Sequence, residues 1–317
     1  MADRSRTVIY AALAGNLLVA LTKFAAAAWT GSAAMMSEGV HSLVDTGDGA
    51  LLLYGLRRSA RRPDPEHPLG HGRELYFWSF IVSLLIVAIG AGVALLEGLL
   101  RILYPNPLTD PFVNYVVIGL SFVFEGASWW IAFKELRRTK GPRGYIEAVL
   151  ESKDPPKFII LLEDTAALIG LLIALSGTLA AAYFDNPLFD GVASVAIGAL
   201  LGATATLLAR ESKHLLIGEG AHPALTQSIL RIAQEEPGVA HAHGALTVHL
   251  APRQIVAALS IEFTDQMTAP QIEKAVESIE ARIHSAHPEV VMLFVKPQTG
   301  HTFSAAREWR LGARAHG

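Results

Sequence analysis

The chain has 317 residues, of which 51% are hydrophobic and only 17% are charged. Soluble globular proteins carry about 25% charged residues, so this composition, with apolar blocks between short charged ones, indicates a membrane protein. A net charge of −3 does not point to nucleic acid, and the lack of cysteine excludes disulfides, iron–sulfur clusters and thiolate zinc sites. Any metal site therefore has to use His, Asp, Glu or backbone oxygen.

Six apolar runs are long enough to cross a bilayer, which takes about 20 helical residues. They are rich in Ala and Leu and too long for barrel strands, so we expect six helices. The first run is too long for the apolar region of a signal peptide, and we expect it to be a retained span. The predicted spans are approximately Val8–Trp29, Ala33–Leu56, Tyr76–Leu100, Phe112–Phe133, Phe158–Tyr183 and Leu188–Leu208.

Basic residues in the connecting segments predict the orientation of these spans. Lys and Arg gather before the first span, in the second and fourth loops and after the sixth span, whereas the first, third and fifth loops contain none apart from Arg101. The positive-inside rule then places both termini in the cytoplasm, and an even number of spans agrees with that. We expect a multi-pass integral protein of the cytoplasmic membrane of a bacterium. In the fourth loop we expect a short amphipathic helix at Tyr145–Ser152.

After Ile217 the composition becomes that of an ordinary soluble protein. The order helix, strand, strand, helix, strand predicts a small α+β domain of ferredoxin-like type. We therefore predict a transmembrane domain at residues 1–212, a cytosolic domain at 213–300 and a flexible basic tail at 301–317. The elements expected in the cytosolic domain are a helix from His222-Pro223 to about Glu235, strands around Ala245–Leu250 and Ile255–Phe263, a helix at Ala269–Ser285 and a strand at Val290–Val295.

Ionisable residues in the second span are the strongest functional feature. His41 and Asp45 are four residues apart, so they share one helix face and can hold a divalent cation together. Ionisable groups in hydrocarbon are costly and usually mark an ion pathway. The alternative is a His–Asp hydrogen bond that ties helices together. Asp48 falls on a neighbouring face and fits a structural role.

The fifth span contributes two adjacent carboxylates. Asp164 could complete the site of His41 and Asp45 from across the bundle, whereas Glu163 points about 100° away around the helix. Glu125 in the fourth span could be a fourth ligand or a proton carrier, or it could bond a neighbouring helix. The residues alone leave these alternatives open.

Histidines outside the spans offer weaker candidates. The second loop contains Asp64, His67 and His71, which can bind a cation at the membrane surface, although a purely structural loop explains them as well. In the soluble domain, His241 and His243 would project to one side of an extended segment. Because histidine on a soluble surface seldom binds metal, His243 is the weakest metal candidate.

Together these motifs resemble the cation diffusion facilitator family of metal exporters, from about Ala11 to Pro297. The resemblance implies a homodimer whose protomers each exchange a cytosolic divalent cation for protons, and therefore a secondary transporter without a cofactor rather than an enzyme. It also implies a tetrahedral transport site made by two residues of span two and two of span five, each pair four apart. The motifs are His41-Ser-Leu-Val-Asp45-Thr, Pro68-Leu-Gly-His71-Gly-Arg-Glu74, Leu162-Glu163-Asp164, Asp190-Gly-Val-Ala-Ser194 and Leu215-Leu-Ile-Gly218-Glu219.

The chain departs from the family pattern in the fifth span. The position four before Asp164 is Ile160, which cannot be a ligand. This resembles the branch of the family with a Glu-Asp pair, and it leaves the fourth ligand open among Glu163, Glu125 and water. The loop residues Asp64, His67 and His71 match a site that some members have.

The soluble domain departs as well. In family members with a two-metal site there, several His and Asp residues lie at the strand ends, and in this chain only His243 corresponds to one of them. Leu259, Val295 and Lys296 occupy other ligand positions. We therefore expect this domain to serve dimerisation rather than metal sensing.

The expected function is efflux of divalent cations from the cytosol by proton antiport with alternating access. Zinc suits a His–carboxylate site best, Fe(II), Co, Ni and Cd suit it nearly as well, and Mn is possible. Proton exchange follows because His41 must lose its proton to bind metal. One alternative is a non-transporting membrane protein of this shape, with a structural or regulatory metal site. The other is an intramembrane metalloenzyme, for which the zinc protease motif H-E-x-x-H is missing from the sequence.

Overall fold

The computed structural model describes residues 2–105, 111–141, 144–145, 148 and 152–312. The chain divides into two compact units, Met1–Lys213 and His214–Gly317. Most of the predicted amphipathic helix at Tyr145–Ser152 lies outside the described residues.

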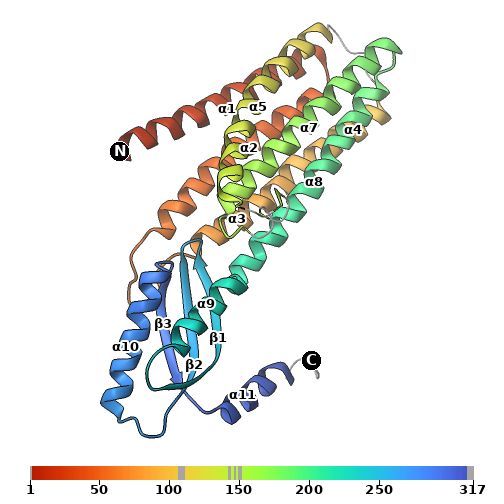
Figure 1. Cartoon of the computed structure of the whole chain (residues 1–317). Coiled ribbons are helices and arrows are strands. Elements are labelled where there is room, and N and C mark those ends of the chain that lie inside the picture. The colour runs from red at the N-terminus through yellow and green to blue at the C-terminus, as the bar shows by residue number, and fades with distance from the viewer. Residues whose placement is uncertain (1, 106–110, 142–143, 146–147, 149–151, 313–317) are drawn as a thin grey trace. The chain divides into compact units, whose positions relative to one another are not determined.

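The first unit is a bundle of long helices (Figure 1). Among the described residues, four stretches are long and apolar enough to cross a membrane: Glu74–Leu103, Phe112–Arg138, Phe158–Tyr183 and Leu188–Ile217. Helices α1 and α2 include the two remaining predicted spans. That the chain has six membrane spans stays a prediction. The elements are α1 (Ala2–Thr30), α2 (Ala33–Ser59), α3 (Glu74–Leu85), the π-helical segment η1 (Ile86–Ala91), α4 (Gly92–Leu103), α5 (Pro111–Thr139), α7 (Pro155–Tyr183) and α8 (Leu188–Ile217).

Small residues let the helices of this unit pack closely. A Cβ atom added at Gly98 of α4 would lie 2.6 Å from the backbone nitrogen of Val195 in α8. One added at Gly198 of α8 would lie 2.8 Å from the side chain of Leu95. This is the packing that small residues permit in membrane bundles. Helix α2 contacts α1, α3, α4 and α7, so its polar residues lie among other helices rather than at the edge of the bundle.

The start of α2 is anchored by a carboxylate from α8. Ser32 caps the helix and donates its hydroxyl to Asp190 Oδ1 at 2.6 Å, while Asp190 Oδ2 accepts the backbone N–H of Ala33 at 2.6 Å. Arg101 Nε lies 3.7 Å from the same Oδ2. A carboxylate stabilises a helix N-terminus because it binds free N–H groups and complements the helix dipole. Asp190 therefore fixes α2, and with it the predicted ligands, relative to α8.

The second unit contains α9 (Pro223–Gln234), β1 (Val239–Ala251), β2 (Gln254–Phe263), α10 (Ala269–Ala286), β3 (Val290–Pro297) and α11 (Gly300–Gly312). The sheet has the order β1-β2-β3, with β1 antiparallel and β3 parallel to β2. Alternate residues Ala257, Leu259 and Ile261 of β2 share one face and are completely buried with Ile229 of α9 and Ile279 of α10. The succession of helices and strands up to β3 is the one predicted, while the ferredoxin-like assignment stays a prediction.

The structure differs from the prediction after residue 300, where a flexible tail was expected. Helix α11 spans Gly300–Gly312. It is attached to the sheet because the Phe303 ring fills the space beside Gly244 of β1, where a Cβ would lie 2.7 Å from the ring. The backbone N–H of Gly300 also donates to Glu262 Oε2 of β2 at 3.1 Å. The basic composition of this segment gave no indication of the contacts that Phe303 makes with β1.

Candidate functional site

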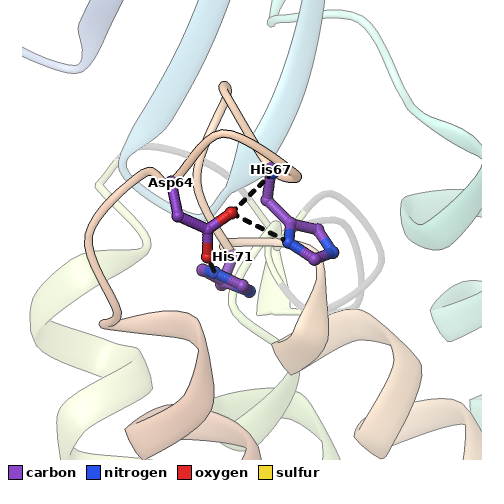
Figure 2. A group of neighbouring side chains, drawn as sticks. All are labelled: Asp64, His67 and His71. Carbon is purple, nitrogen blue, oxygen red and sulfur yellow. Dashed lines mark hydrogen bonds and ion pairs between the residues drawn. The ribbon is translucent and has the colours of Figure 1, made fainter.

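Three side chains of the loop between α2 and α3 are already gathered. Among the residues that the structure describes, Asp64, His67 and His71 are the one group of three or more His and acidic side chains whose ligand atoms all lie within 4.8 Å of one another. Figure 2 shows both histidines turned toward the Asp64 carboxylate. Asp64 Oδ1 lies 3.2 Å from His67 Nδ1, and Asp64 Oδ2 lies 2.9 Å from His71 Nε2.

Local backbone contacts hold this loop in shape. Asp64 Oδ1 accepts the backbone N–H groups of His67 at 2.7 Å and Glu66 at 3.1 Å, and Gly70 turns the chain with a φ of +80°. Hydrogen bonds from the His71 side chain and the His67 backbone lower the pKa of Asp64 to about 2, so the carboxylate is ionised at neutral pH. A carboxylate and two neutral imidazoles can supply three ligands of a tetrahedral zinc ion, with water as the fourth.

The predicted ligands of span two lie inside the bundle on α2. His41 is 1% exposed, and its Nδ1 lies 3.2 Å from Asp45 Oδ1. Apart from this contact with each other, both ring nitrogens of His41 and Asp45 Oδ1 lack a hydrogen-bond partner within the described part of the chain. Both residues belong to one helix, so the pair does not tie two helices together. A buried polar atom left unsatisfied costs about 1–3 kcal/mol, which makes these atoms candidates for a ligand.

The predicted ligands of the fifth span lie on α7, which contacts both α2 and α5. Asp164 Oδ2 accepts the hydroxyl of Ser128 of α5 at 2.8 Å. Glu163 is buried, and its Oε1 has no hydrogen-bond partner among the described residues. Ile160 is 41% exposed on the outside of this unit, where an apolar side chain suits lipid. Asp48, for which a structural role was expected, is buried, and its Oδ2 has no hydrogen-bond partner among the described residues.

Glu125 of α5 has a partner of its own. Its Oε1 accepts the ammonium group of Lys23 of α1 at 2.6 Å. Of the roles left open by the sequence, the structure shows the bond to a neighbouring helix. The α2 and α7 carboxylates and His41 do not form a cluster as tight as that of the loop in the described residues.

His243 of the soluble unit is already bonded. Its Nε2 lies 2.7 Å from Glu262 Oε2, and its ring stacks on Phe303 of α11 with centroids 5.7 Å apart. The hydrogen bond from His243, together with that from the Gly300 N–H, lowers the pKa of Glu262. Leu259 is completely buried in the apolar core, and Val295 packs against it. These contacts favour a structural role for His243.

Lys23 and Glu38 are buried charged residues that were not among the predicted site residues. Lys23 is the only charged residue in the first apolar run, Val8–Trp29. The rule that ionisable groups inside a membrane mark a functional site would have found it. The structure pairs its ammonium group with Glu38 Oε2 of α2 at 3.1 Å.

Comparison with known proteins matches residues 9–217 to the family described as the cation efflux transmembrane domain. The mitochondrial proton-coupled zinc antiporter SLC30A9 of Mus musculus is 33% identical over 270 residues, which are 84% of this chain and 48% of that protein. The metal tolerance protein C4 of Arabidopsis thaliana is 31% identical over 268 residues, 84% of this chain and 58% of that protein.

A bacterial relative covers more of both chains. The cation-efflux pump FieF of Escherichia coli (strain K12 / DH10B) is 25% identical over 291 residues, which are 90% of this chain and 89% of that protein. By contrast, the chain spans about half the length of the mitochondrial relatives that it matches.

Proposed function

Because this chain belongs to the cation diffusion facilitator family, we propose that it moves divalent metal cations out of the cytosol in exchange for protons. The substrate cation binds inside the bundle between α2 and α7. One observation carries this proposal, namely the buried ligand atoms on these two helices that accept or donate no hydrogen bond in the described residues, although His41 Nδ1 and Asp45 Oδ1 lie 3.2 Å apart. They are both ring nitrogens of His41, Asp45 Oδ1 and Glu163 Oε1.

In this proposal His41, Asp45 and Asp164 bind the cation, and Glu163 completes the site. Glu125 is outside the ligand set because its carboxylate is bonded to Lys23. A site with one imidazole and several carboxylates suits zinc best. It also suits Fe(II), Co, Ni and Cd, and it can bind Mn, which prefers oxygen ligands. A cation bound by both helices replaces the contact of Asp164 with Ser128.

Proton exchange follows from the chemistry of these ligands. An imidazole has to be neutral and a carboxylate ionised before either binds metal, so binding releases protons and protonation releases metal. The same ligand atoms therefore carry the cation in one direction and protons in the other. Alternating access to the two sides of the membrane makes this an exchange rather than a leak.

The wider arrangement belongs to the same proposal. Six spans place both termini in the cytoplasm, in the cytoplasmic membrane of a bacterium. The loop with Asp64, His67 and His71 then lies on the cytoplasmic side and offers a second cation site there. The soluble unit, with its α+β order, joins two protomers as a ferredoxin-like dimerisation domain.

Uptake into proteoliposomes tests the proposal. With an acidic interior, the reconstituted chain is expected to accumulate zinc and to acidify the outside, and both signals should stop when an ionophore collapses the proton gradient. A panel of Zn, Fe(II), Co, Ni, Cd and Mn then ranks the substrates. A protein that binds zinc without accumulating it contradicts the proposal and supports the non-transporting alternative, for which the preformed loop site is the favouring observation.

A further inference from the structure

Lys23 is a buried cation that the proposed transport site does not use. Its side chain is completely buried on α1. An ammonium group has three hydrogen-bond donors, and here each has an acceptor. Lys23 Nζ lies 2.6 Å from Glu125 Oε1, 2.8 Å from Ser42 Oγ and 3.1 Å from Glu38 Oε2.

Two of these acceptors are on α2, next to the predicted ligands. Ser42 follows His41 in the sequence, and Glu38 is one helical turn before His41. Helix α2 therefore presents His41 and the acceptors of Lys23 within one turn. Any change in the charge around Lys23 alters the electrostatic potential at His41, because charges inside a low-dielectric bundle are weakly screened.

The third acceptor connects Lys23 to α7. Glu125 is one helical turn before Ser128 on α5, and Ser128 donates its hydroxyl to Asp164 Oδ2 at 2.8 Å. The same α5–α7 contact contains the hydrogen bond from Trp129 Nε1 to Thr165 Oγ1 at 3.0 Å. Lys23 therefore binds a carboxylate on the very helix that supports the α7 ligand.

The carboxylates around Lys23 have spare ligand atoms. Glu38 Oε1 and Glu125 Oε2 are buried and have no hydrogen-bond partner in the described part of the chain. Glu38 Oε1 lies against Gly170 of α7, where a Cβ atom would overlap it. Without the ammonium group of Lys23, the carboxylates of Glu38 and Glu125 would lose their counter-charge next to the proposed transport site. Carboxylate oxygens are the ligands that suit manganese, whereas imidazole favours zinc.

We propose that Lys23 is a specificity-determining residue, a tethered cation that holds Glu38 and Glu125 away from the substrate and so preserves the preference for zinc over manganese. This inference rests on the proposed function. The simpler role for such a buried ion pair is to fasten helices together. A fastening role predicts lower stability with unchanged metal selectivity in the molecules that fold.

The test is the ratio of the Mn²⁺ and Zn²⁺ dissociation constants, measured by equilibrium dialysis on the purified full chain. A His67→Ala/His71→Ala background removes the loop site from the measurement. Lys23→Met/Glu38→Gln removes one charge of each sign, keeps the net charge and frees Glu125. We expect the ratio of the Mn²⁺ constant to the Zn²⁺ constant to fall by about tenfold or more, the usual scale for altered coordination.

Adding Glu125→Gln to that double variant is the matched control, and it should restore the wild-type ratio. An unchanged ratio in the folded double variant overturns the inference. A second arm does not depend on the stability of that variant. Glu125→Gln alone leaves the Lys23 charge less compensated, which should weaken Zn²⁺ and Mn²⁺ binding alike, so the ratio of their dissociation constants should stay within about threefold of the wild-type value. A change in that ratio of about tenfold or more likewise overturns the inference.

The two proposals fail in different measurements. Wild-type proteoliposomes that do not accumulate zinc contradict the proposed function, whatever the ratio of dissociation constants. Wild-type transport together with an unchanged ratio in Lys23→Met/Glu38→Gln contradicts only the role given to Lys23.

Discussion

The loop between α2 and α3 and the interior of the helix bundle present metal-binding side chains in opposite ways. In the loop, Asp64, His67 and His71 come from one short segment, and their polar atoms already face each other. In the bundle, His41 and Glu163 come from distant segments, are buried, and present atoms without hydrogen-bond partners in the described structure. Ligands that lack partners gain more from a cation than ligands that are already bonded. The bundle is therefore the better place for an exchanged substrate.

The largest expected effect of a ligand change is on the bundle site. Glu163→Gln keeps the shape of the side chain and removes its charge. In the His67→Ala/His71→Ala background, which lacks the loop metal site, Glu163→Gln should lower zinc affinity about tenfold or more, the usual scale for damaged coordination. Isothermal titration calorimetry on the purified chain checks this. An unchanged affinity would mean that water completes the site and that Glu163 is not a ligand.

Within the bundle, packing should matter more where α4 meets α8 than at the exposed position Gly119 of α5. Gly98→Ala places a Cβ 2.6 Å from the backbone of Val195, so we expect a loss of about 1–3 kcal/mol in the free energy of unfolding. Gly119→Ala is the matched control, because a Cβ there meets nothing within 4 Å. Thermal unfolding in detergent should separate the two variants. Equal midpoints would contradict the close approach of α4 and α8.

The soluble unit should affect assembly more than selectivity. Removing the chain after Gly220 should weaken dimers and lower zinc transport several-fold, with the order of preferred metals unchanged. Cross-linking in membranes and the ion panel in proteoliposomes measure the two effects. If His243→Ala removed one tightly bound zinc per protomer from the full chain, a metal role would replace the dimerisation role.

The smallest effect on transport is expected from the loop. His67→Ala/His71→Ala should remove one bound zinc per protomer at equilibrium and change the uptake rate by less than about threefold, because the substrate site lies elsewhere. Counting bound zinc by mass spectrometry and measuring uptake on the same preparation checks both. A complete loss of uptake would make the loop part of the transport path.

The loop also has a defined pH dependence. Because the pKa of Asp64 is lowered to about 2, its favourable contribution to the folded loop is complete above the ordinary carboxyl value of about 3.9. That contribution is lost as the pH falls through about 2. Carbon NMR should therefore show Asp64 still ionised between pH 7 and pH 5, and a carboxyl group that takes up a proton in that range would contradict the hydrogen bonds described for the loop.

Much of this arrangement could be predicted from patterns that are local in the sequence. Apolar run length predicted long helices, and the spacing of His41 and Asp45 predicted that they share one face of α2. The gathering of Asp64, His67 and His71 also follows from a short loop with turn residues. Each of these depends on residues that are close along the chain.

What could not be predicted depends on packing between distant segments. The bond between Lys23 and Glu125 joins α1 to α5, and no spacing rule relates the two residues. The contact between Phe303 of α11 and Gly244 of β1 likewise joins distant segments, and the residues around Phe303 were expected to form a flexible tail. The sequence left Glu125 with three possible roles, and only its buried partner distinguishes them.

Transport in this proposal depends on a cation that binds inside the bundle. Zinc uptake by Asp45→Ala in proteoliposomes under a proton gradient tests it most directly, with cross-linking to show that the variant still forms dimers. We predict that uptake falls to the level of empty liposomes while the loop still binds one zinc per protomer. Uptake at the wild-type rate would mean that the transported cation does not bind at Asp45.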